Sequence, residues 1–153
     1  MNWGAKTYEE RNATNRNSGE ELFEAHCRHH GYKIHRVGFD EKNNSVDNFF
    51  NLNDLLRNLP DYIVNTGTET FVINVKGTAN FKKKEVMMLP EMMEWFSSKK
   101  APLLYAFCFE GFRPKLVYPD NIIKLYENAT DKKWNDGVVY RTLDLGKLIP
   151  VEM

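Results

Sequence analysis

The sequence predicts an α/β fold, a sheet flanked by helices, and two observations support this. Segments with helical spacing of apolar residues and segments of strand character follow one another in the order α-β-β-β-α-β, before a small C-terminal α/β tail. The near-continuous apolar run 102–109, PLLYAFCF, is typical of a central strand covered on both faces. Helices and strands in this order pack as layers around one core.

Length and composition indicate a single globular domain. The chain has 153 residues, of which 42% are hydrophobic and 27% charged. We expect a flexible polar segment over residues 1–17 and one domain over residues 18–153. The 21 basic and 21 acidic side chains cancel. Binding to a polyanion therefore requires a local basic patch rather than a global field.

The sequence predicts a cytoplasmic protein, in the host cytoplasm if a phage encodes it. No apolar run reaches the length of a membrane span, and the polar N-terminus lacks the apolar region of a secretion signal. We therefore expect no membrane partner. Cys27 and Cys108 lie in apolar patterns, so we expect reduced core cysteines rather than a disulfide.

Local signals place the elements of the N-terminal half. Ser18 and Glu21 have the spacing of a capping box, which predicts a helix from Ser18 to Gly31. Residues 32–39 alternate as a strand does, and the leucines in 52–59 have helical spacing.

Two further strands are expected at 61–65 and 70–77, joined by a turn at Gly67. Pro90 suits the first turn of the next helix. After the central strand, a hairpin partner is expected over 113–119. A short helix near 121–126 and a strand near 138–142 complete the chain.

The two strands before and after Gly67 are expected to gather polar side chains at one end of the sheet. If the turn centres between Gly67 and Thr68, Asp61 lies across from Asn74. Alternation along the strand then places Asn74 and Lys76 on the same face. A carboxylate, a second oxygen ligand and a lysine can together hold a divalent cation and cleave a phosphodiester.

This pattern, Pro60-Asp61 followed by a hairpin and Asn74-Val75-Lys76-Gly77, resembles the PD-(D/E)xK nuclease superfamily. The resemblance covers residues 18–109, and small Holliday junction resolvases and phage or restriction-type endonucleases have the same layout. It implies a restriction-endonuclease-like core and Mg²⁺-dependent or Mn²⁺-dependent cleavage of branched or duplex DNA. It also implies a homodimer. No glycine-rich phosphate loop is present, so no nucleotide cofactor is expected.

The chain departs from the family at Asn74, where the family has an acid. An amide oxygen can bind a hard cation but adds no charge. In the family the missing acid can move to the helix after the lysine strand, where Glu91 is the best candidate and Glu94 the next. Family members also often carry a glutamate on the first helix. Glu20 and Glu24 both border its apolar side, and counting back from the Gly31 turn slightly favours Glu20.

A basic stretch follows the lysine strand directly. Lys82, Lys83 and Lys84 are expected to contact phosphates and to give salt-dependent binding without base specificity. A solvated charge run would have the same sequence.

Three other interpretations stay open. The chain could be a nuclease-fold module that no longer cuts and binds DNA or a protein through the basic stretch and the Met-rich segment 87–96. It could also be an unrelated α/β interaction protein, in which Asp61 and Lys76 would lie far apart. Finally, His26 and His30 have the spacing of a metal pair, although no matching cluster exists elsewhere and edge-of-core histidines are the simpler interpretation.

Overall fold

The computed structural model describes residues 8–37, 60–96 and 100–153, with side chains from residue 19 onward. The short helix expected over residues 52–59 lies outside the described residues. In the part of the chain that is described, no helix has the length and apolar character needed to cross a membrane.

The central element is a mixed sheet whose strand order is β1-β2-β3-β5-β6. Strands β3 and β5 run parallel, and the other neighbouring pairs are antiparallel. A parallel pair needs a crossover connection, which α4 and α5 provide here. The bounds of these strands are β1 (Lys33–Arg36), β2 (Tyr62–Asn65), β3 (Thr70–Lys76), β5 (Leu103–Phe107) and β6 (Lys115–Val117).

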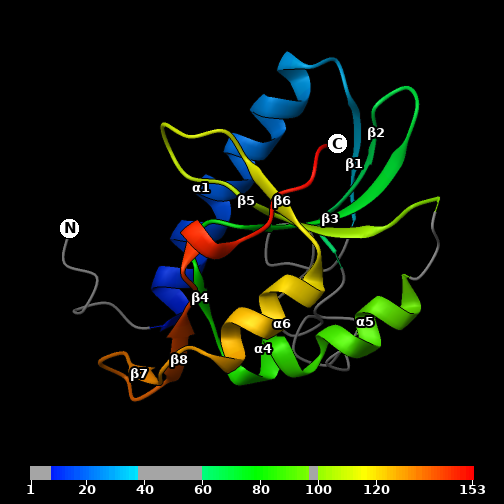
Figure 1. Cartoon of the computed structure of the whole chain (residues 1–153). Coiled ribbons are helices and arrows are strands. Elements are labelled where there is room, and N and C mark those ends of the chain that lie inside the picture. The colour runs from blue at the N-terminus through cyan, green and yellow to red at the C-terminus, as the bar shows by residue number, and fades with distance from the viewer. Residues whose placement is uncertain (1–7, 38–59, 97–99) are drawn as a thin grey trace.

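Helices cover both faces of this sheet (Figure 1). Helix α1 lies on one face, and three shorter helices lie toward the other. These helices are α1 (Tyr8–His29), α4 (Lys83–Met87), α5 (Leu89–Trp95) and α6 (Pro119–Glu127). The predicted α/β fold with a mixed sheet and flanking helices is therefore confirmed.

Each face of the sheet has its own apolar core. Phe23 and Cys27 of α1 pack against Tyr62, Ile73 and other side chains on the first face. The second face packs against α4, α5 and α6. Its buried core members are Val72, Phe81, Val86, Leu89, Met92, Leu103, Tyr105, Phe107, Val117, Ile122, Tyr126, Leu143 and Leu148. All five residues of β5 are buried, as expected for a central strand.

The C-terminal segment belongs to this core. Strand β4 (Asn80–Phe81) pairs with β8 (Val139–Thr142), and β8 pairs with β7 (Lys132–Lys133), forming a small second sheet. A 3₁₀ turn, η2 (Leu145–Lys147), follows. Leu143 and Leu148 are buried in the second core, so the predicted tail is packed into the domain.

Helix α1 begins earlier than the sequence pattern predicted. It starts at Tyr8, so the expected start at Ser18 is wrong, and Ser18 lies within the helix. Extending an existing helix adds one hydrogen bond for each residue that is fixed. Residues 8–17 contain Glu, Arg and Ala, which favour helix, and contain no Gly or Pro to stop it. The helix ends where Gly31 adopts a φ of 70°.

Candidate active site

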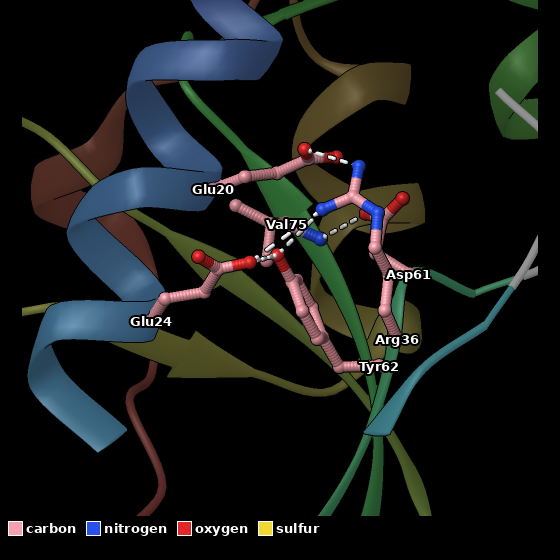
Figure 2. A network of polar contacts seen from close by, with 6 residues as sticks. All are labelled: Glu20, Glu24, Arg36, Asp61, Tyr62 and Val75. Atoms are coloured by element: carbon pink, nitrogen blue, oxygen red, sulfur yellow. Dashed lines mark hydrogen bonds and ion pairs between the residues drawn. The ribbon is translucent and has the colours of Figure 1, made fainter. Parts of the chain in front are cut away.

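The β2–β3 hairpin has the register that the turn predicted. Asn65 pairs with Thr70 and Tyr62 with Ile73, which places Asp61 across from Asn74. The backbone N–H of Asp61 donates to the carbonyl of Ile73 at 2.9 Å. Its carboxylate Oδ2 accepts from the N–H of Val75 at 2.8 Å, as Figure 2 shows. Asp61 is therefore fixed to the strand on both sides of Asn74.

Asn74 is held from the neighbouring strand. It lies in register with Tyr105 of β5, and its Nδ2 donates to the Tyr105 hydroxyl at 3.2 Å. Burial, together with the nearby carboxylates of Glu85 and Asp61, raises the pKa of Tyr105, while the Asn74 bond lowers it. This hydroxyl therefore stays neutral at ordinary pH and orients the Asn74 amide.

Lys76 is paired with a carboxylate that the motif does not include. Its Nζ lies 3.0 Å from Oε2 of Glu85 and 4.4 Å from the ring centroid of Phe81. The two charged side chains are 17% and 24% exposed, so water screens the pair only partly. The other oxygen of Glu85 accepts from the backbone N–H of Lys82 at 3.3 Å, which fixes the carboxylate at the start of α4.

The pattern in the sequence did not identify Glu85. It lies in the stretch NFKKKEV, whose three lysines predict a basic patch and not an acidic site residue. A signal was present, because Glu85 follows Lys82 at the three-residue spacing of a capping interaction. Lys82 has the extended backbone that precedes a helix, with a φ of −82° and a ψ of 153°.

The other expected acids lie elsewhere. Glu91 and Glu94 are exposed on α5, and neither makes a hydrogen bond or ion pair with another described residue. Lys83 and Lys84 are exposed in the first turn of α4, while Lys82 is partly buried beside Glu85. The structure thus brings together Asp61, Asn74, Lys76, Tyr105 and Glu85, which we call the lysine–carboxylate cluster.

The glutamates of the first helix belong to a network around Arg36 (Figure 2). Glu20 Oε2 accepts from Arg36 at 2.7 Å, and Glu24 Oε1 lies 3.5 Å from the same guanidinium. The Tyr62 hydroxyl donates to Glu24 at 2.5 Å and accepts from Arg36 at 3.0 Å. The pKa of Tyr62 is raised by burial and by its bond to Glu24.

Glu20 is almost fully buried, with 1% of its surface exposed. Its second oxygen, Oε1, has no hydrogen-bond partner among the described residues. A buried acceptor without a partner costs free energy, which a bound water or cation at this oxygen would offset. One oxygen of Glu20 therefore binds Arg36, and the other is available to bind a water or a cation.

The donor set fits a hard divalent cation held by few protein ligands. The carboxylate of Asp61 and the amide oxygen of Asn74 are both hard donors, which Mg²⁺ and Mn²⁺ prefer. Among residues 8–37, 60–96 and 100–153, no group of three or more His, Cys, Asp and Glu side chains is arranged to hold a metal ion. The ring centroids of His26 and His30 lie 4.4 Å apart with the rings tilted, and the described residues supply no third ligand beside them.

Comparison with known proteins identifies the fold. No protein-family model matches the chain, and no curated protein sequence matches it. A solved structure of Archaeoglobus fulgidus Hjc, a Holliday junction resolvase from an archaeal hyperthermophile, is similar, with a TM-score of 0.50 and 11% sequence identity. The match covers 88% of this chain and 94% of that one. At this identity the likeness concerns the fold alone, and the chain has a restriction-endonuclease-like fold.

Proposed function

We propose that the chain is a metal-dependent DNA endonuclease of the PD-(D/E)xK type that acts on branched DNA in the manner of a resolvase. The hairpin register carries this proposal, because it sets Asp61 opposite Asn74 and ties its carboxylate to the N–H of the residue before Lys76. The fold shared with Hjc supports branched DNA as the substrate class. A homodimer would supply one site for each strand.

The side chains of the cluster have different roles in this reaction, and that of Tyr105 is to position the Asn74 amide. Asp61 and the Asn74 amide oxygen would hold Mg²⁺ or Mn²⁺, and Glu20 Oε1 or the expected Glu24 would complete the ligands. The bound cation would supply an activated water and neutralise charge on the phosphate. Lys76, held in place by Glu85, would orient that water or the scissile phosphate. Lys82, Lys83 and Lys84 would contact the backbone.

The test is a cleavage assay with Mg²⁺ or Mn²⁺ on a four-way junction and on linear duplex of the same sequence. Asp61→Ala and Lys76→Ala are expected to abolish cleavage. Asp120→Ala and Lys124→Ala change exposed side chains of α6 and serve as matched controls. Unchanged cleavage in both site variants would refute the assignment.

A second candidate is a nuclease-fold module that binds DNA without cutting it. Two observations favour it. Asn74 contributes no charge, and the positive charge of Lys76 is already balanced by the Glu85 carboxylate, 3.0 Å away. Asn74→Asp tests this candidate, with Asn135→Asp as the exposed control. Metal-dependent cleavage that appears only in Asn74→Asp supports the inactive module, whereas cleavage by the wild-type chain excludes it.

A further inference from the structure

The small sheet formed by β4, β8 and β7 places two lysines on either side of a tyrosine. Phe81 pairs with Arg141, so the next residue, Lys82, lies beside Tyr140 in the same extended conformation. Tyr140 in turn pairs with Lys132. Residues directly opposite each other in an antiparallel sheet share a face. Lys82, Tyr140 and Lys132 therefore form one row across three strands, which lie together in Figure 1.

The contacts of the alternate residues show that this row faces outward. Phe81 is buried in the second core, and Arg141 donates to the carbonyl of Tyr126 at 2.9 Å. These side chains mark the inner face of the small sheet. Because side chains alternate between the two faces along a strand, Lys82, Tyr140 and Lys132 lie on the outer face. Lys132 is exposed there, and its Nζ lies 3.5 Å from the Thr142 hydroxyl.

An aromatic pair lies in the middle of the outer face. The rings of Trp134 and Tyr140 stack with 4.0 Å between centroids and an angle of 12° between planes. Both side chains are partly exposed. The nearby acid Asp131 is 2.8 Å from the Arg141 guanidinium, so its charge is compensated within the protein. The outer face therefore combines an aromatic pair with two lysines, Lys82 and Lys132.

Lys82 links this face to the lysine–carboxylate cluster. The backbone N–H of Lys82 donates to Glu85, whose other oxygen binds Lys76. The Nζ of Lys76 also lies over the ring of Phe81, the residue before Lys82.

We propose that the outer face binds a single-stranded segment of DNA next to the cleavage site. Unpaired bases stack on aromatic side chains, and flanking lysines neutralise the phosphates on either side. The faces of paired bases are stacked inside the duplex, so paired bases cannot stack on Trp134 and Tyr140. This inference rests on the proposed function, because the ligand that it assigns to the outer face is the unpaired part of a DNA substrate.

The test is binding of a labelled 20-nucleotide oligo-dT in EDTA, measured by fluorescence anisotropy, so that no cleavage occurs. Lys132→Ala is expected to weaken binding about five-fold and to lower the slope of log affinity against log salt by about 0.7. Tyr140→Leu is expected to weaken binding about five-fold or more. Lys133→Ala, which changes an exposed lysine on the opposite face, is expected to stay within about two-fold.

Several outcomes would overturn this inference. One is equal loss of affinity in Lys132→Ala and Lys133→Ala, and another is duplex DNA bound as tightly as oligo-dT. Tighter binding of oligo-rU than of oligo-dT would assign the face to RNA instead. If oligo-dT still quenches tryptophan fluorescence in Trp134→Phe but no longer does so in Trp95→Phe, the DNA binds near Trp95 and not on the outer face.

The two proposals fail separately. A wild-type chain that binds oligo-dT through Lys132 but never cleaves a junction refutes the endonuclease and leaves the binding face. A chain that cleaves junctions through Asp61 but does not bind oligo-dT refutes the binding face and leaves the endonuclease.

Discussion

The Glu85 carboxylate lies 3.0 Å from the Lys76 ammonium, and its other oxygen is fixed by the backbone of Lys82. The carboxylate of Glu85 also acts on Tyr105, whose hydroxyl accepts a hydrogen bond from Asn74. The cluster therefore contains a second carboxylate besides that of Asp61, which comes from α4 and is paired with Lys76.

Glu85→Gln tests whether this charge serves cleavage. The amide removes the ion pair and leaves Lys76 free to change position, and a small misplacement of a catalytic group costs up to about 10²-fold in rate. We expect junction cleavage to fall about 10- to 100-fold, measured as the single-turnover rate at saturating Mg²⁺.

Glu91→Gln is the matched control, since Glu91 carries the same charge on the next helix and is exposed. We expect its rate to stay within about two-fold of wild type. If Glu91→Gln is the more severe of the two variants, the second acid is the one that the family resemblance implied, and Glu85 is structural.

The ion pair between the buried Glu20 and the partly exposed Arg36 should matter for stability. Arg36→Met leaves the carboxylate of Glu20, which is 1% exposed, without its counter-charge. Removing one partner of a buried pair costs about 3 kcal/mol. Urea unfolding at pH 7 is expected to show this loss, whereas Arg28→Met, at an exposed position of α1, should change stability by less than about 0.5 kcal/mol.

The double variant Arg36→Met/Glu20→Gln separates charge from packing. It removes the uncompensated charge together with its partner, so we expect part of the lost stability to return. A double variant less stable than Arg36→Met alone would show that Glu20 is stabilised by other contacts.

The hairpin and the central strand could be predicted because their signals are local. Gly67 adopts a φ of 99°, and the turn around it sets the register that brings Asp61 to Asn74. The apolar run 102–109 identified β5 by its composition alone. Both features depend on residues close together in the sequence.

The Lys76–Glu85 pair and the small sheet depend on tertiary contacts instead. No periodicity shows that β8 returns to pair with β4, because Asn80 and Thr142 are 62 residues apart. The pairing of Arg36 with Glu20 likewise depends on how α1 lies on the sheet. Sequence alone could rank the candidate glutamates only by their positions along each helix, because their partners come from other elements.

The two buried thiols should make stability fall at alkaline pH. Burial raises the pKa of Cys27 from 9.0 to about 11, with the Glu24 carboxylate adding to the rise, and burial raises that of Cys108 from 9.0 to about 12. Above pH 9 the unfolded chain loses these protons while the folded chain keeps them. The unfolded state then binds fewer protons, so the free energy of unfolding decreases as pH rises from about 9 toward 11.

Urea midpoints at pH 8, 9 and 10 measure this dependence. A Cys27→Ala/Cys108→Ala variant should lose less stability over that interval than wild type. Part of the loss should remain, because the pKa values of Tyr62 and Tyr105 are raised as well. An equal loss in both proteins would show that the thiols do not contribute.

Gly19→Ala should destabilise the chain, although alanine is the better helix former. In an unconstrained helix this substitution gains roughly 0.5–1 kcal/mol. Here an added Cβ would lie 3.1 Å from both the Cα and the N of Gly77, and 3.4 Å from the Val75 side chain. Gly77 presents backbone that follows Lys76 directly, so it cannot rotate away as a side chain would, and α1 must move instead.

We therefore expect Gly19→Ala to lose about 1–3 kcal/mol of unfolding free energy, the usual cost of overpacking. Ala25→Gly, at an exposed position of the same helix, should lose about 1 kcal/mol from helix propensity alone. The close approach of α1 to β3 predicts that both changes destabilise, although they are opposite substitutions. Helix propensity alone predicts opposite signs, so a Gly19→Ala variant more stable than wild type in urea would show that α1 has room to move at the end of β3.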